Sequence, residues 1–232
     1  MVRTKQCYHF PQAFIIQSTK NMTERAYKIQ QMLGEAELNP SVTLALQTLS
    51  KEALKRVKRE NISLETYKEL QRRFRKDKVT TYTDLLIGLP GETYDSFANG
   101  IDQVISEGQH HRIQFFNVFV LPNAEMGDPS YRQEQGIETI WSPYVFSMDT
   151  SRPTRDEVFE QQEMIIATKS MPREEWIKMR VLAWYTDLLH LNRKLLQIPF
   201  IFLHELAGFT YRKLLESYLS ISLPNLTILR DI

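Results

Sequence analysis

Short apolar runs alternate with helical patterns over the first half of the chain. The apolar runs have the length of β-strands and lie at 12–17, 41–47, 80–89 and 112–122. Between them, apolar residues recur every three or four positions, which is the spacing of a helix with one buried face. Strands that alternate with helices predict a parallel sheet with right-handed crossovers. Four such strands in about 120 residues are too few for a closed eight-fold barrel, so we expect a partial (β/α) barrel or a short open sheet.

Capping residues mark where these helices begin. Thr23, Ser50 and Ser63 each precede a helical stretch and are candidate N-caps. Thr93 or Asp95 begins the helix that follows the run at 80–89. The local signals therefore agree with the alternating pattern.

The pattern changes after Pro122. Residues 126–153 are rich in turn formers and predict an irregular connection. Thr154 can begin a helix over 155–170, and Pro172 suits the first turn of a second helix that runs to a break at Pro199. A third helix is expected over 201–219. The predicted fold is α/β, a partial barrel of parallel strands over 1–125, with the connection at 126–153 and a helical region over 154–232.

Composition and charge exclude several classes of protein. The chain has 232 residues, of which 42% are hydrophobic and 25% charged, as in a soluble globular protein. A net charge of +1 gives no bulk electrostatic case for binding nucleic acid or an anionic membrane. The first residues carry charges and no apolar signal segment, and no apolar run is long enough to span a membrane, so a cytoplasmic location is expected. Cys7 is the single cysteine, which excludes an internal disulfide and an all-cysteine metal site.

Polar residues stand at the carboxyl ends of the predicted strands. They are Gln47, Asp84 and Asn117, and parallel strand ends share one rim where sites form. A carboxylate inside an apolar strand is costly unless it is hydrogen-bonded. A ribose hydroxyl pair would satisfy Asp84, and so would a backbone N–H or a basic neighbour; the spacing alone does not choose.

The turn "GLPGET" at 88–93 joins this rim to the next helix. Gly88 and Gly91 permit positive φ and close approach of the backbone, and Pro90 fixes the turn. The helix start beyond it would favour an anion. An ordinary strand-to-helix turn has the same composition, so this motif alone is weak evidence for a site.

The motif "DLLIGLPGET", preceded by "LALQTLSKEALKRVKREN", resembles the second half of the radical SAM partial barrel. The family pattern there is "QS…L…R" followed by "DxIxGLPGET", and the match covers 41–122, with 8–33 fitting the preceding unit more loosely. The continuation "HRIQFFNVFVLPNAEMGDPSYRQEQGIE" resembles the subgroup that carries a cobalamin-binding domain. In that subgroup a helical C-terminal region follows, and methyl transfer is the usual reaction.

The resemblance implies roles for single residues. The guanidinium of Arg59 would pair with the carboxylate of S-adenosyl-L-methionine (SAM), a task that suits its fork of donors. The acid at 84 would hold the ribose hydroxyls, and the turn glycines would let the backbone approach the nucleoside. The implied cofactor-binding residues are Gln47, near the ribose and methionyl group, Arg59, Asp84, Leu86, against adenine, and Phe119, whose backbone lies near adenine.

Purely structural roles, without a ligand, stay open for the same residues. Arg59 lies in a run of basic residues that would be solvated on a helix surface. Phe119, with Phe115 and Phe116, is of a type more often found in a core. His110 and His111 fall in a predicted loop and are not assigned to a site.

The chain departs from the family in its cysteines. Radical SAM enzymes hold a [4Fe–4S] cluster on a CxxxCxxC loop, and here Cys7 has no second or third cysteine near it. The glycine-rich segment that holds the SAM amino group is also missing. We therefore expect the first two strands, the cluster loop and any cobalamin domain to lie upstream, in the same or a separate chain, and this portion alone to be unable to cleave SAM. No catalytic residue or metal ligand is assigned within it.

Three hypotheses follow. The first is the C-terminal part of a cobalamin-dependent radical SAM enzyme that acts on an unknown small molecule, and it predicts an upstream reading frame with CxxxCxxC. The second is a degenerate subunit that binds a nucleoside or a partner without chemistry. The third is an α/β interaction domain without a ligand, in which Gln47, Arg59 and Asp84 would not converge.

Overall fold

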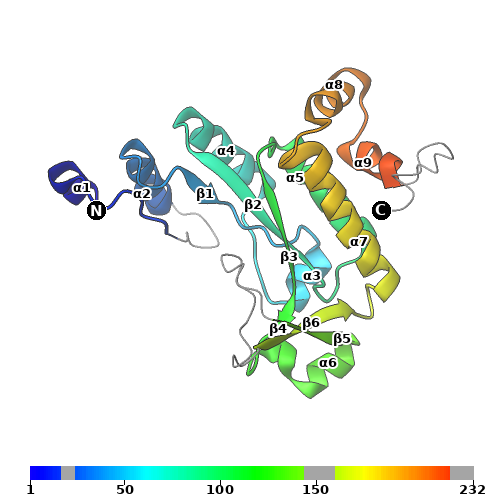
Figure 1. Cartoon of the computed structure of the whole chain (residues 1–232). Coiled ribbons are helices and arrows are strands. Elements are labelled where there is room, and N and C mark those ends of the chain that lie inside the picture. Colours follow the sequence, from blue (N-terminus) through cyan, green and yellow to red (C-terminus); the bar gives the residue numbers. More distant parts are fainter. Residues whose placement is uncertain (17–23, 144–159, 220–232) are drawn as a thin grey trace, which may run out of the picture.

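Two three-stranded sheets, one parallel and one antiparallel, carry the helices of the protein. The computed structural model of the chain describes residues 1–16, 24–143 and 160–219 (Figure 1). The parallel sheet has the order β1–β2–β3, and the antiparallel sheet has the order β4–β6–β5. The strands are β1 Ser41–Thr43, β2 Thr80–Ile87, β3 Ile113–Asn117, β4 Phe119–Val120, β5 Glu138–Pro143 and β6 Gln161–Ala167.

The parallel sheet confirms the predicted strand order. β2 is the central strand and pairs in parallel with β1, Val42 opposite Thr81, and with β3, Leu85 opposite Phe115. Side chains along β2 alternate between buried and half-buried positions, so one face of this strand packs fully into the core. Tyr67 and Phe74 of the covering helix α4 are completely buried in that core. The fold class is mixed α/β with a parallel sheet, as predicted.

Three of the predicted N-caps are made as expected. Ser50 Oγ accepts from the N–H of Ala53 at 3.2 Å, and Ser63 Oγ accepts from the N–H of Thr66 at 3.1 Å. Thr93 forms a reciprocal capping box with Ser96. The fourth candidate, Thr23, lies outside the described residues. The helices are α1 Val2–Tyr8, α2 Glu24–Glu35, α3 Lys51–Arg56, α4 Leu64–Lys76, α5 Tyr94–Ser106, α6 Pro129–Gln135, α7 Arg173–Thr186, α8 Gln197–Ala207 and α9 Tyr211–Leu219, with a 3₁₀ turn at Glu125–Gly127 and a π-helical turn at Asp187–Leu191.

The strand predicted at 12–17 is wrong over its described part. Residues 12–16 form no strand, and Ile15 is 83% exposed. A single backbone bond, from Phe14 N–H to Leu38 O at 2.8 Å, ties this segment to the described part of the chain. An apolar run forms a strand when a neighbour pairs with it, and β1 pairs only with β2 among the described residues.

The run at 112–122 is two strands rather than one. The chain leaves the parallel sheet after Asn117, and Phe119 and Val120 pair with β6 of the antiparallel sheet.

The helix predicted over 155–170 is wrong in its described part, because 161–167 is strand β6. The predicted irregular connection contains α6 and β5, and Arg132 of α6 binds Glu163 of β6 at 2.5 Å. The division into 1–125, 126–153 and 154–232 stays a prediction.

The C-terminal helices break at other points than predicted. The π-helical turn extends α7, and the chain then turns before α8 begins. Pro199 therefore lies within the first turn of α8, where its missing N–H costs no helical bond. Gly208, with φ of 70°, ends α8 and separates it from α9. No helix in the three described ranges is long and apolar enough to cross a membrane.

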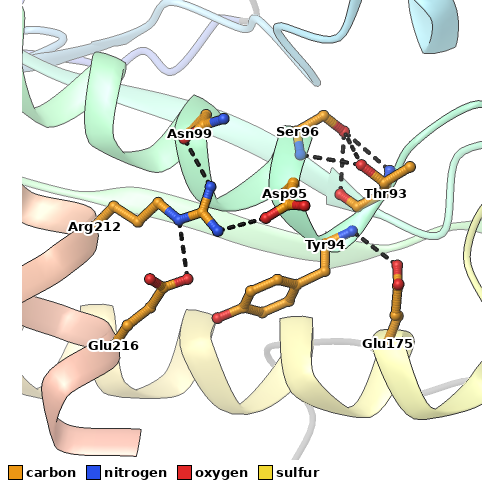
Figure 2. Close-up of polar contacts among 8 residues, drawn as sticks. All are labelled: Thr93, Tyr94, Asp95, Ser96, Asn99, Glu175, Arg212 and Glu216. Carbon is orange, nitrogen blue, oxygen red and sulfur yellow. Dashed lines mark hydrogen bonds and ion pairs between the residues drawn. The ribbon is translucent and has the colours of Figure 1, made fainter.

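Helices α7 and α9 dock on the start of α5 through one polar joint. Figure 2 shows Arg212 of α9 reaching Asp95 and Asn99 of α5 and Glu216 of its own helix. Glu175 of α7 accepts from the N–H of Tyr94, the first residue of α5, at 3.0 Å. The joint fixes the C-terminal helices to the helix that follows the "GLPGET" turn.

We expect Arg212→Ala to lower the free energy of unfolding by about 1–2 kcal/mol, because a half-buried guanidinium loses a network of charged partners. Urea denaturation followed by circular dichroism measures this change. Arg72→Ala is the matched control, since Arg72 binds Glu69 alone among the described residues and is well exposed, and its effect should stay below about 0.5 kcal/mol. Equal effects of the two substitutions would contradict the joint.

Candidate functional site

An open cleft of about 1300 Å³ lies beyond the carboxyl end of β2. Its walls come from the segment after β1, from α3 and the chain that follows it, and from the ends of β2 and β3 into β4. Four of the five predicted cofactor-binding residues line this cleft: Gln47, Arg59, Leu86 and Phe119.

Gln47 is held against β2 by its backbone. Its N–H donates to Asp84 O at 2.8 Å, and its carbonyl accepts from Leu86 N–H at 2.7 Å. Its φ is 63°, an uncommon left-handed conformation for a residue other than glycine. Beyond the end of β1, Gln47 thus forms one further parallel bridge with Leu85 of β2, and the chain then turns beside the cleft. Such conformations persist only where the surroundings fix them, and they are concentrated at functional sites.

Arg59 is half-buried in the wall of the cleft and has no ion pair among the described residues. Its Nε donates to Asn61 Oδ1 at 3.0 Å, and its Nη2 donates to Ala45 O at 2.8 Å. Its Nη1 is buried and has no partner. Burial lowers the pKa of the guanidinium from its usual value, and no nearby carboxylate opposes that shift. An unpaired donor on a desolvated cation is the feature of this cleft that most directly calls for an anionic ligand.

Asp84 does not line the cleft, although it lies two residues before Leu86 on the same face of β2. In the orientation of its amide that satisfies both neighbours, Gln114 donates to Asp84 Oδ1 at 3.0 Å and accepts from Arg112 at 3.1 Å. Burial raises the pKa of Asp84, and the charge of Arg112 partly opposes that rise. A neighbouring side chain on β3 therefore satisfies one carboxylate oxygen.

The glycines of the turn pack against the protein itself. A Cβ on Gly91, whose φ is 87°, would lie 3.0 Å from the backbone N of Ala53 and 3.0 Å from the carbonyl carbon of Glu52. A Cβ on Gly88 would approach Ile165 of β6 at 3.5 Å. Close backbone approach to α3 therefore requires a glycine at position 91, whereas Gly88 is required by its φ of 112° alone. The contact with α3 gives the second glycine of the turn a role in packing, apart from any approach to a nucleoside.

The start of α5 is not an open anion site. The N–H of Thr93 donates to Ser96 Oγ, the N–H of Ser96 donates to Thr93 Oγ1, and the N–H of Tyr94 donates to Glu175. These side chains take the donors that an anion would use.

Two polar residues of the site were missed by the sequence analysis. Glu92 is 1% exposed, and its carboxylate accepts hydrogen bonds from the hydroxyls of Thr48 and Ser96. Asn61 lines the cleft and donates from Nδ2 to Thr48 O at 2.7 Å. The final "ET" of the motif was the available signal for Glu92, because a glutamate in a buried turn needs hydrogen-bond donors.

The histidines do not lie at the cleft. His110, in the turn between α5 and β3, makes a 3.0 Å hydrogen bond through Nδ1 to Nε2 of His190 in the π-helical turn, and His111 is exposed. The residues that the structure describes contain no group of three or more His, Cys, Asp or Glu side chains that could hold a metal ion. Cys7 is exposed on α1. These residues do not fit a [4Fe–4S] cluster, whose ligands are several thiolates.

Comparison with known proteins identifies relatives of most of the chain. No protein-family model matches the chain. It is 30% identical over 207 residues to the cobalamin-dependent radical SAM methyltransferase TokK of Streptomyces tokunonensis, covering 89% of this chain and 30% of TokK. It is also 30% identical over 167 residues to 2-(S-pantetheinyl)-carbapenam-3-carboxylate methyltransferase of Streptantibioticus cattleyicolor, covering 72% of this chain and 24% of that enzyme. The chain thus spans less than a third of either relative.

Among solved structures, the radical SAM methyltransferase TsrM of Kitasatospora setae, determined with cobalamin and a [4Fe–4S] cluster bound, superposes with a TM-score of 0.46. The sequences are 15% identical, and the match covers 82% of this chain and 40% of TsrM. TokK confirms the resemblance found in the motifs: the chain is a homologue of one portion of a cobalamin-dependent radical SAM methyltransferase. The second relative is also a methyltransferase.

Proposed function

We propose that this chain forms the SAM-binding rim of a cobalamin-dependent radical SAM methyltransferase and acts together with a cluster-bearing part, in the same or a separate chain. The observation that carries the proposal is the guanidinium of Arg59, desolvated in the wall of a large cleft, without a carboxylate partner and with an unpaired Nη1. The carboxylate of SAM has the charge and the two oxygens that such a group binds.

The remaining residues would bind the nucleoside end of SAM. Leu86 and Phe119 form an apolar wall that suits an adenine ring, and Gln47 brings an amide and a fixed backbone corner to the same cleft. Asp84 lies outside the lining of the cleft but on the same face of β2 as Leu86, and it would take the ribose hydroxyls with its second oxygen, the first being held by Gln114. SAM supplies the methyl and deoxyadenosyl chemistry of this family when it is bound. This chain contributes binding and orientation, and its residues do not supply the thiolates of a cluster.

A pair of ligands tests the role of Arg59 in the chain as it exists. SAM carries the carboxylate, whereas 5′-methylthioadenosine has the same nucleoside and lacks it. Arg59→Ala should weaken SAM binding by about 1.5–3 kcal/mol, or roughly 10- to 150-fold, and leave methylthioadenosine unchanged. NMR chemical-shift titration measures dissociation constants into the millimolar range, where we expect them to lie without a cluster. Arg56→Ala is the control, since Arg56 already binds Glu52 and Gln135.

Asp84→Ala should weaken both ligands, because both carry the ribose, by about 1–3 kcal/mol. The same titration measures this. If SAM binds equally well to the native chain and to the Arg59→Ala and Asp84→Ala variants, the SAM site that the resemblance implies does not exist.

A second candidate function is a nucleoside-binding or partner-binding subunit without chemistry. Cys7 as the single cysteine of the sequence is the observation that favours it. The two candidates differ in the DNA upstream of this sequence and in the purified partner. A cluster-bearing protein with CxxxCxxC that co-purifies with this chain and cleaves SAM in its presence supports the methyltransferase; retained SAM affinity with no such partner supports the binding subunit.

A further inference from the structure

We propose that Asn61 and Glu92 are positioning residues of the SAM site: Asn61 holds the guanidinium of Arg59, and Glu92 holds Thr48, the residue that follows Gln47. This inference rests on the proposed function and adds two residues to it. Neither residue would touch SAM through the groups used here, because their polar atoms are engaged with the protein. Their effect would pass through a short chain of hydrogen bonds from α5 to Arg59.

Asn61 uses both ends of its amide. Its Oδ1 accepts from Arg59 Nε at 3.0 Å, and its Nδ2 donates to the carbonyl of Thr48 at 2.7 Å. The amide thus joins the guanidinium to the backbone corner next to Gln47. An amide suits this position because one partner is a donor and the other an acceptor, and its oxygen and nitrogen meet one each.

Arg59 is held at two points by this arrangement. Nε is fixed by Asn61 and Nη2 by the carbonyl of Ala45, so the planar guanidinium has one orientation. Nη1, which is covered by the surrounding protein, is the one guanidinium nitrogen left without a partner among the described residues. A flexible arginine would lose rotamer freedom on binding, and fixing it beforehand removes most of that cost.

Glu92 fixes the other end of this series of hydrogen bonds, at Thr48. Its buried carboxylate accepts from the hydroxyls of Thr48 on one side and Ser96 of α5 on the other. The same Thr48 hydroxyl accepts from the N–H of Ser50 at 2.9 Å. Thr48 is therefore held on three sides, through its hydroxyl by Glu92 and Ser50 and through its carbonyl by Asn61. It directly follows Gln47, whose left-handed φ needs such support.

The test is a titration of SAM and 5′-methylthioadenosine into the full chain, followed by NMR. Asn61→Ala should weaken SAM binding about three- to tenfold and leave methylthioadenosine unchanged, because only the carboxylate contact depends on Arg59. Asn61→Ala in the Arg59→Ala background should have no further effect on SAM, since the residue it positions is gone. Ser63→Ala, which removes a nearby cap outside the cleft, is the control for general destabilisation.

A readout without ligand separates positioning from folding. In the native chain the Arg59 Nε–H should exchange slowly with water because it is hydrogen-bonded and half-buried, and Asn61→Ala should speed that exchange while the amide spectrum keeps its dispersion. Glu92→Gln, which keeps the size and one acceptor, should retain most SAM affinity, whereas Glu92→Ala should lose it by at least as much as Asn61→Ala. If Glu92→Ala does not fold, the measurements on Asn61→Ala alone decide whether the inference holds.

The outcomes distinguish this inference from the proposed function. If Arg59→Ala weakens SAM binding and Asn61→Ala does not, the positioning role of Asn61 is overturned and the SAM site stands. The same holds if the two losses of affinity add fully in the double variant. If Arg59→Ala leaves SAM unaffected, both fail. Equal loss of SAM and methylthioadenosine in Asn61→Ala would also overturn the inference, because it would show a structural effect on the whole cleft.

Discussion

Gly91→Ala should destabilise the protein by about 3–5 kcal/mol, through a strained backbone and a clash with helix α3. The φ of Gly91 is 87°, a conformation that residues with a Cβ rarely adopt. The added Cβ would also lie within 3.0 Å of backbone atoms of Glu52 and Ala53, which cannot swing aside as a flexible side chain would. Either the turn or the helix must move.

The matched control is Gly208→Ala. Gly208 has a similar φ of 70°, and nothing lies within 4 Å of where its Cβ would be. That substitution carries the backbone strain alone, so it should cost about 1 kcal/mol. The difference in urea unfolding free energy between the two variants isolates the contact between the turn and α3. Equal costs would mean that α3 does not press on the turn.

This contact matters for the site because α3 leads directly into Arg59. If Gly91→Ala displaces α3 without unfolding the chain, the guanidinium should move with it, and SAM affinity should fall along with stability. The glycine of the motif would then support ligand binding through packing, at a distance from the nucleoside.

The sequence was sufficient to predict the parts of the fold that depend on local chemistry. Ser50, Ser63 and Thr93 cap their helices because a hydroxyl just before a helix accepts from the otherwise unpaired N–H groups of its first turn. The order of the parallel strands followed from short right-handed crossovers. Four of the five predicted site residues line one cleft. Gln47 and Leu86 do so because the carboxyl ends of parallel strands meet at one edge. Arg59 follows α3 and Phe119 belongs to the antiparallel sheet, so only the family resemblance pointed to them.

The errors arose where a distant partner decides the structure. The apolar run at 161–167 has no period that separates a strand from a buried helix, and it is a strand because β4 and β5 pair with it on either side. Residues 12–16 have the composition of a strand and no partner strand among the described residues. Asn61 and Glu92 carried no pattern of their own, because their roles depend on Thr48, which lies 13 residues from the first and 44 from the second.

Acidification should weaken the protein through a buried histidine pair, and His190 should account for most of the effect of that pair. His190 is 0% exposed, and its Nδ1 is buried without a partner. It stacks on Phe200 and lies edge-to-face with Tyr211, and its Nε2 shares a hydrogen bond with His110. Protonating this pair would place a positive charge among buried aromatic rings.

The direction of the effect follows from the two pKa values. Burial, with smaller contributions from the charges of His110 and Lys194, lowers the pKa of His190 from its ordinary 6.5 to about 3. Between those values the unfolded chain binds a proton that the folded chain does not, so stability falls as the pH falls. The stabilisation is complete above pH 6.5, and roughly 2 kcal/mol of it should be lost between pH 7 and pH 5.

His190→Phe removes the titrating group and keeps a flat ring among Phe200 and Tyr211. Urea unfolding at pH 7 and pH 5 should show a smaller loss of stability for His190→Phe than for the native chain, by about 2 kcal/mol. His111→Gln, which changes an exposed histidine one residue beyond His110, should leave most of the pH dependence in place. Since His190 joins the π-helical turn to α8 and α9, the first probe to respond at pH 5 should be Trp184 fluorescence rather than the parallel sheet. A native chain whose stability is the same at pH 7 and pH 5 would show that His190 takes up its proton in the folded state without cost.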